Sequence, residues 1–123
     1  MVSVILPNYN HVVYLKERIE SILNQTYQNF ELILLDDCSE DNSCDILNAY
    51  KEHPKVSALV LNEKNTGNTF LQWDRGIRLA KGKYVWIAES DDTADIHFLE
   101  ATVAALELNP SAIMCLTGSI LID

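Results

Sequence analysis

Short and almost wholly apolar runs alternate along this chain with longer segments in which apolar residues recur every three or four positions. The apolar runs cover residues 2–6, 30–35, 56–61, 84–88 and 112–117, and the periodic segments cover residues 12–23, 44–52, 69–80 and 96–108. Runs without a polar side are typical of strands that helices cover on both faces, and helical crossovers join parallel strands. The sequence therefore predicts an α/β fold, with a mainly parallel sheet between layers of helices, in one domain over residues 1–123.

The same patterns predict which side chains are buried. In the third periodic segment the side chains expected to face the sheet are Phe70, Trp73, Ile77 and Ala80. Trp86, in the fourth apolar run, is expected in the core. The basic residues expected on the solvated surface are Lys16, Arg18, Lys81 and Lys83, and the three histidines are given no role. The patterns do not encode the order of the strands in the sheet.

The charge balance restricts the partners. The chain carries 18 acidic and 9 basic residues, a net charge of -9, which argues against a nucleic-acid partner because binding the phosphate backbone needs a basic surface. A nucleotide is still allowed, since a metal ion held by acids can screen its phosphates.

Cysteine content and hydropathy indicate the compartment. The three cysteines (Cys38, Cys44 and Cys115) have no disulfide-framework spacing, which favours reduced thiols and a cytoplasmic location. No apolar run approaches the roughly 20 residues of a membrane helix. Association with a membrane through another part of a longer protein is left open.

Two carboxylates stand side by side after the fourth apolar run. Asp91 and Asp92 repel each other unless a cation or several hydrogen-bond donors lie between them, and Mn²⁺ or Mg²⁺ prefers oxygen ligands. A solvated turn that caps the next helix is the alternative. Since ligands of parallel sheets bind at the carboxyl ends of the strands, the first interpretation predicts a metal at this edge.

Polar residues also follow the other predicted strands. Asp36 and Asp37 follow the second, Pro7 and Tyr9 lie at the end of the first, and Asn65 comes after the third. A carboxylate at this edge can accept hydrogen bonds from a nucleotide base or from ribose hydroxyls. The alternatives are a simple turn for the acidic pair, a packing aromatic for Tyr9 and a turn residue for Asn65.

Five short motifs in a consistent order resemble the family 2 glycosyltransferases, which are inverting sugar-transfer enzymes. The resemblance covers essentially the whole chain and is carried by residues 2–10, 21–27, 30–41, 65–68 with 76–84, and 90–92. It implies the GT-A fold of nucleotide-diphospho-sugar transferases, a Rossmann-like three-layer α/β/α arrangement. It also implies a nucleotide diphosphate sugar as donor, a UDP-sugar in the first place, a saccharide, lipid or protein acceptor, and a place in cell-wall or polysaccharide biosynthesis.

The resemblance implies individual roles as well. Asp37 would contact the nucleotide base, and Pro7 and Tyr9 would line the base pocket, with Asn65 nearby. Asp91 would lie against the ribose, and Asp92 would bind Mn²⁺ or Mg²⁺.

Two departures from the family pattern bear on function. Gln72-Trp73-Asp74-Arg75 stands where many relatives have an Arg-Asn pair, which weakens the case for a diphosphate-binding arginine there. An inverting transfer also needs a carboxylate base beside the acceptor, and the family places it in the following half of the domain. We therefore expect a truncated GT-A domain whose base lies beyond Asp123, inactive by itself and prone to self-association through the truncated edge.

Three other classes of protein share part of this pattern. A receiver domain has similar length and acids, but its acidic pair follows the first strand. A dinucleotide-binding domain needs a glycine-rich first loop, which is absent here. A receiver-like signalling domain and a non-catalytic nucleotide-binding or interaction module stay open as the alternatives.

Overall fold

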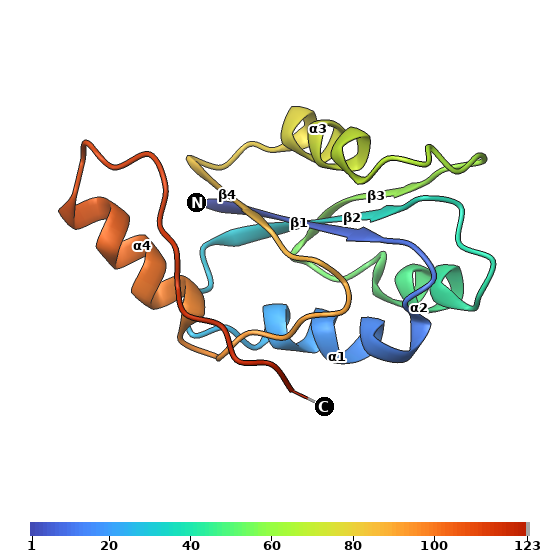
Figure 1. The fold of residues 1–123 in the computed structure, drawn as a ribbon, viewed down its shortest axis with the longest axis horizontal. Coiled ribbons are helices and arrows are strands. Elements are labelled where there is room, and N and C mark those ends of the chain that lie inside the picture. The colour runs from blue at the N-terminus through green and yellow to red at the C-terminus, as the bar shows by residue number, and fades with distance from the viewer. Residues whose placement is uncertain (123) are drawn as a thin grey trace.

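The computed structural model describes residues 1–122, which form one all-parallel four-stranded sheet and four helices (Figure 1). The strands are β1 (Val2–Asn8), β2 (Phe30–Asp36), β3 (Val56–Leu61) and β4 (Tyr84–Ile87), and their order in the sheet is β3-β2-β1-β4. The helices are α1 (Val12–Leu23), α2 (Ser43–Tyr50), α3 (Thr69–Leu79) and α4 (Phe98–Leu108). The predicted α/β class with a parallel sheet is confirmed.

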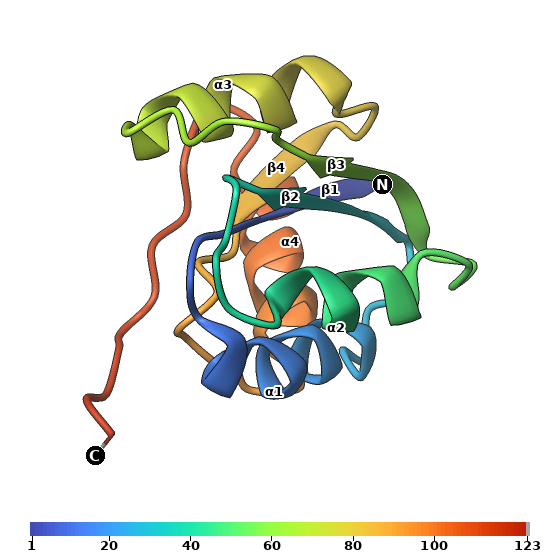
Figure 2. The ribbon, with the colours of Figure 1, turned by 90° about the vertical axis from the view of Figure 1, so that its right-hand side faces the viewer.

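The helices form two layers around the sheet. Helix α3 covers one face, and α1, α2 and α4 lie on the other (Figure 2). The two faces of β1 show why: Val4 and Leu6 pack with Ile19 of α1 in the larger core, whereas Ile5 packs with Ile33 in a smaller core under α3. Both faces of the central strands are thus buried and mostly apolar, and the buried polar pair Ser3 and Glu31 is joined by a hydrogen bond.

The buried side of α3 differs from the prediction. Phe70 and Ile77 are 68% and 50% exposed, whereas Gln72 and Gly76 are buried against the sheet. A Cβ atom at Gly76 would overlap the side chain of Ile5, so the glycine allows the helix backbone to approach β1 closely. The hydrophobic pattern predicted that the large apolar side chains of α3 face the sheet. The close approach of the helix backbone at Gly76 instead determines which side of α3 faces it.

The predicted fifth strand over residues 112–117 is wrong. Residues 110–122 contain no strand, and within residues 1–122 β4 pairs only with β1. Side chains of residues 113–115 instead line a groove of about 350 Å³ with β4 and α4. An apolar run indicates a segment suited to burial, but hydrogen bonding to a neighbouring strand decides whether it forms a strand.

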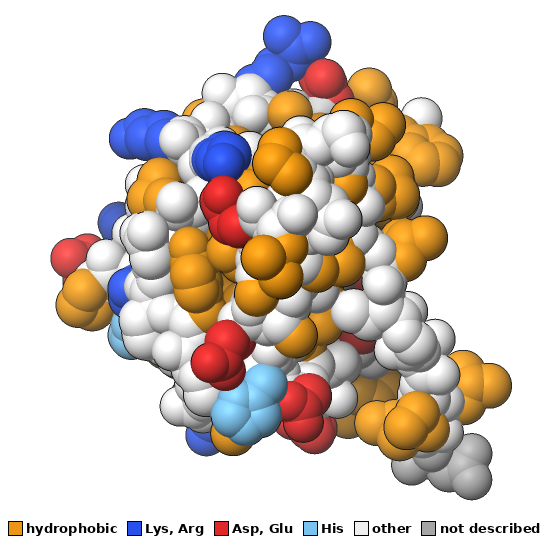
Figure 3. All heavy atoms as spheres, turned by 90° about the vertical axis from the view of Figure 1, so that its left-hand side faces the viewer, with side chains coloured by type: hydrophobic (Ala, Val, Ile, Leu, Met, Phe, Trp, Pro, Cys, Tyr) orange, Lys and Arg blue, Asp and Glu red, His pale blue; other side chains and the backbone are white. Residues whose placement is uncertain are grey.

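The face formed by α4 and the segments beside it is rich in exposed apolar side chains. Ile113 is fully exposed and Leu108 is 81% exposed, and Figure 3 shows hydrophobic side chains spread across this face. Self-association through the β4 edge, which belongs to this face, stays a prediction.

In the part of the chain that the structure describes, no helix combines the length and hydropathy needed to cross a membrane.

Candidate functional site

A cavity of about 200 Å³ lies at the carboxyl ends of the strands. Its lining comes from the loops after β1, β2 and β4 and from the first turns of α3: Pro7, Asn8, Tyr9, His11, Asp37, Thr69, Gln72, Glu89 and Ser90. Of the residues singled out in the sequence, Pro7, Tyr9 and Asp37 are brought together here. Asn65, Asp91 and Asp92 do not line the cavity.

Asp37 is buried and its carboxylate is held by hydrogen bonds from the loop after β3. Asn62 Nδ2 and the Thr66 backbone N–H both donate to Oδ1 at 2.9 Å, and Thr66 Oγ1 donates to Oδ2 at 2.7 Å. Burial by itself raises the pKa of this carboxyl, but the hydrogen bonds from Asn62 and Thr66 outweigh it and lower the pKa below its ordinary value. The side chain is therefore an ionised acceptor in a fixed position.

Asn65 shapes the loop that holds Asp37. Its Nδ2 donates to the Asp37 carbonyl at 2.9 Å, and its Oδ1 accepts from the backbone N–H of Gly67 at 2.6 Å. Gly67 has a φ of 67°, in the left-handed region that favours glycine. Asn65 thus shapes a turn in the structure, and its predicted place near the donor stays a prediction.

Asp36, the neighbour of Asp37, has a structural role. It is completely buried, and it accepts from Asn8 Nδ2 at 2.9 Å and from Ser39 Oγ at 2.6 Å. These contacts tie the ends of β1 and β2 together. The two adjacent acids thus have different roles, since Asp36 fixes the loop and Asp37 faces the cavity. Tyr9 also lines the cavity and is half-exposed.

The acidic loop, residues Glu89–Asp92, forms the opposite side of the site. Its first residue accepts a hydrogen bond from Trp73 Nε1 at 2.8 Å, and the Ser90 hydroxyl is 2.8 Å from His11 Nδ1. Burial, together with the charges of Asp91 and Asp92, raises the pKa of Glu89 despite the hydrogen bond from Trp73. His11 lines the cavity although the sequence analysis gave it no role. Its position in the loop after the first strand could have indicated that it lies at this edge of the sheet.

Asp91 and Asp92 are exposed, and no hydrogen bond to either side chain is present among residues 1–122. No group of three His, Cys, Asp or Glu side chains in these residues could hold a metal ion. Mg²⁺ typically binds one or two carboxylates and takes its remaining ligands from substrate phosphates and water. The exposed pair fits a cation of this kind, which a diphosphate would help to hold.

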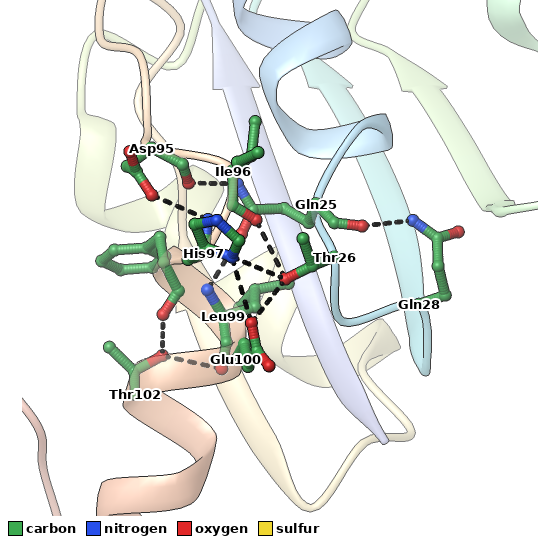
Figure 4. A network of polar contacts seen from close by, with 10 residues as sticks. Gln25, Thr26, Gln28, Asp95, Ile96, His97, Leu99, Glu100 and Thr102 are labelled. Atoms are coloured by element: carbon green, nitrogen blue, oxygen red, sulfur yellow. Dashed lines mark hydrogen bonds and ion pairs between the residues drawn. The ribbon is translucent and has the colours of Figure 1, made fainter.

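The turn after α1 fixes the segment that follows the acidic loop (Figure 4). Gln25 is buried; its Nε2 donates to the Asp95 carbonyl at 2.7 Å, and its Oε1 accepts from the Leu99 backbone N–H at 2.9 Å. The Thr26 backbone N–H donates to the Ile96 carbonyl at 2.9 Å. The acidic loop is therefore held at its start by β1, through Ala88, and beyond its far end by the turn after α1.

The prediction of a solvated Arg18 is wrong. Arg18 is only 3% exposed, and its guanidinium carbon lies 5.0 Å from the centre of the Trp86 ring. It lies on the same side of α1 as the core residues Leu15 and Ile22, three residues before and four after it, so helical periodicity was the signal that its charge obscured. Trp86 and Phe98 stack at 4.5 Å and extend this contact to α4.

Comparison with known proteins shows which family this chain resembles. A family model described as glycosyl transferase family 2 matches residues 3–119. Glycosyltransferase GlyG of Streptococcus pneumoniae is 42% identical over 100 residues, which are 81% of this chain and 33% of GlyG. Poly(ribitol-phosphate) beta-N-acetylglucosaminyltransferase TarP of Staphylococcus aureus is 37% identical over 101 residues, 80% of this chain and 31% of TarP.

Among solved structures, S. aureus TarS 1-349 in complex with UDP-GlcNAc has a TM-score of 0.79 and 28% sequence identity, covering 89% of this chain and 32% of the TarS chain. The present chain thus spans about a third of the length of each of these relatives.

Proposed function

The chain belongs to glycosyl transferase family 2, and on that premise we propose that residues 1–123 are the donor-binding part of a GT-A glycosyltransferase domain. The donor is a nucleotide diphosphate sugar, a UDP-sugar in the first place, and the whole enzyme transfers its sugar to an acceptor with inversion. The observation that supports this most directly is the fixed, ionised Asp37 carboxylate in the cavity beside Pro7 and Tyr9.

The base of the donor would occupy the Asp37 side of the cavity. A carboxylate offers about four acceptor directions, and three of those of Asp37 are used by Asn62 and Thr66. The direction left on Oδ2 can accept the N–H of a uracil ring. Because the other three hydrogen bonds hold the oxygen in place, little ordering is left to occur when the base binds. TarS, a relative at 28% identity, was solved with UDP-GlcNAc.

The acidic loop would meet the ribose and the diphosphate. In this proposal Asp91 accepts a ribose hydroxyl and Asp92 is the protein ligand of Mn²⁺ or Mg²⁺. The metal, when bound, supplies neutralisation of the charge on the departing diphosphate. The high exposure of both side chains leaves them free for these partners.

The proton of the acceptor hydroxyl needs a general base, which we place outside residues 1–123. We therefore expect this chain to bind donor but to transfer sugar poorly or not at all by itself. The acceptor is not fixed by the donor site; the relation to TarP favours a cell-wall polymer as its class.

Calorimetric titration of the chain with UDP, in the presence and absence of Mn²⁺, tests the proposal. We expect binding in both conditions and tighter binding with Mn²⁺, with ADP as the control for recognition of the base. A well-folded chain that binds UDP in neither condition would contradict the proposed function.

A further inference from the structure

Arg18 is a buried cation whose hydrogen bonds are incomplete. Its Nε and Nη1 atoms are inaccessible to solvent and have no hydrogen-bond partner in the part of the chain that the structure describes. None of the three ion pairs among residues 1–122 includes it. An unpaired buried charge is strongly unfavourable, so a partner for these two N–H groups is expected nearby.

The acidic loop is the candidate for this partner, since it begins three residues after Trp86, over whose ring the Arg18 guanidinium lies. Burial lowers the pKa of its guanidinium, and the carboxylates that oppose this effect are Asp92, Asp91 and Glu89, in decreasing order. All three belong to the acidic loop. The charge of Arg18 therefore acts on that loop from the face of the sheet that α1 covers.

The guanidinium also lies over an aromatic ring. It lies 5.0 Å from the Trp86 ring centre, and Trp86 stacks against Phe98 at the start of α4. The acidic loop connects these two aromatic residues along the chain, between β4 and α4. A planar cation over Trp86 thus lies near the start of the loop, and its fork of N–H groups suits a carboxylate.

We propose that Arg18 is a positioning residue for the acidic loop: when the metal binds, its guanidinium donates to the Asp92 carboxylate and holds it in the orientation of a metal ligand. Arg18 has this role only if Asp92 is a metal ligand, as proposed above. Carboxylates that bind metals are commonly oriented by a second hydrogen-bonding partner, and loss of that partner costs about 10- to 100-fold in metal affinity.

If Arg18 positions Asp92, removal of its side chain lowers the affinity for Mn²⁺. A merely electrostatic or structural role of Arg18 predicts no such loss. A cation beside a metal site repels the metal, so its removal would leave Mn²⁺ affinity unchanged or increase it. Replacement of an unpaired buried charge by an apolar side chain of similar size also tends to preserve or raise stability. The sign of the change in metal affinity therefore distinguishes positioning from the other two roles.

The experiment compares the wild-type chain with R18M, R18K and K16M. Mn²⁺ is titrated by electron paramagnetic resonance in the presence of saturating UDP, and UDP is titrated by calorimetry without metal. Lys16 is exposed on the same helix, so K16M matches the change in charge without the contact to Trp86.

We expect R18M to lose about 10- to 100-fold in Mn²⁺ affinity while its metal-free UDP affinity and melting temperature are retained, and K16M to behave as wild type. R18K, which keeps the charge but not the planar fork, is expected to lose less. Wild-type or tighter Mn²⁺ binding by R18M overturns the proposal, and should R18M not fold, unchanged affinity in R18K does so. If the wild-type chain binds UDP but shows no effect of Mn²⁺, the proposed metal site fails and the role of Arg18 fails with it; if it binds no UDP, the donor site itself fails.

Discussion

The two sides of the cavity are built differently. Asp37 is 6% exposed, and its carboxylate accepts three hydrogen bonds from the loop after β3. Asp91 and Asp92, on the acidic loop, are exposed and accept none from residues 1–122. The Asp37 side is therefore complete before a ligand binds, whereas the acidic loop needs a cation to balance its charges.

This difference matches the chemistry that each side is proposed to perform. Recognition of a base depends on a fixed acceptor, since a displaced hydrogen bond loses most of its discrimination. A metal and a diphosphate arrive and leave with each turnover, so their ligands have to be accessible. Variants on the two sides should consequently fail in different ways.

The largest effect is expected from Asp37→Ala. The change removes the acceptor of three hydrogen bonds, so the chain should lose about 2 kcal/mol of stability, since hydrogen bonds to charged groups contribute about 1.5–3 kcal/mol each and water replaces part of them. UDP affinity should fall about 10- to 100-fold both with and without Mn²⁺. Urea unfolding and calorimetry measure the two changes. An undiminished metal-free UDP affinity would remove Asp37 from the base site.

Asp92→Ala should have a narrower effect. Because the side chain is exposed and accepts no hydrogen bond from residues 1–122, stability should stay within about 0.5 kcal/mol of wild type. The gain in UDP affinity on addition of Mn²⁺ should disappear, while metal-free UDP binding is retained. Asp74→Ala, which removes an exposed acid on α3, is the matched control. Mn²⁺ dependence that survives in Asp92→Ala would assign the metal to another residue.

The two sides also differ in how far the sequence predicted them. The position of Asp37 after a buried strand was sufficient to place it at the sheet edge, because parallel strands all end at that edge. Its burial and its bonds to Asn62 and Thr66 depend on how the loop after β3 folds back, which no pattern within either segment encodes. The division between a structural Asp36 and an available Asp37 likewise needed the three-dimensional contacts.

On the other side, the acidic pair was visible in the sequence but its supports were not. Gln25 and Thr26 lie about 70 residues before the segment that they hold, and Arg18 lies about as far before the acidic loop. Hydrophobic periodicity treats such polar residues as surface, although Gln25 and Arg18 are almost fully buried. Four strands and four helices were predicted from apolar patterns, and the fifth strand failed for the related reason that strand pairing is a non-local property.

The stability contributed by Asp37 should depend on pH in a predictable direction. Its pKa in the folded chain is lower than the ordinary value of 3.8, so its contribution is fully present above that value and is lost as the pH falls through the folded pKa. Urea midpoints of wild type and Asp37→Asn should differ by a constant amount from neutral pH to about pH 5 and converge below about pH 4. The comparison between the two chains cancels the other titrating acids. A difference that stays constant down to pH 3 would mean that the carboxylate is not stabilised by its hydrogen bonds.

Trp73→Phe is expected to have the smallest effect, and it tests whether the two sides are independent. Helix α3 touches both: Thr69 and Gln72 line the cavity near Asp37, and Trp73 donates to Glu89 at the start of the acidic loop. Loss of this one hydrogen bond should weaken Mn²⁺-dependent UDP binding by about 2- to 5-fold, which corresponds to about 0.5–1 kcal/mol, and leave metal-free binding unchanged. Calorimetry in both conditions measures the two affinities. If the UDP affinities with and without Mn²⁺ fall together, α3 couples the Asp37 side and the acidic loop into one unit. The two sides of the cavity would then not act independently.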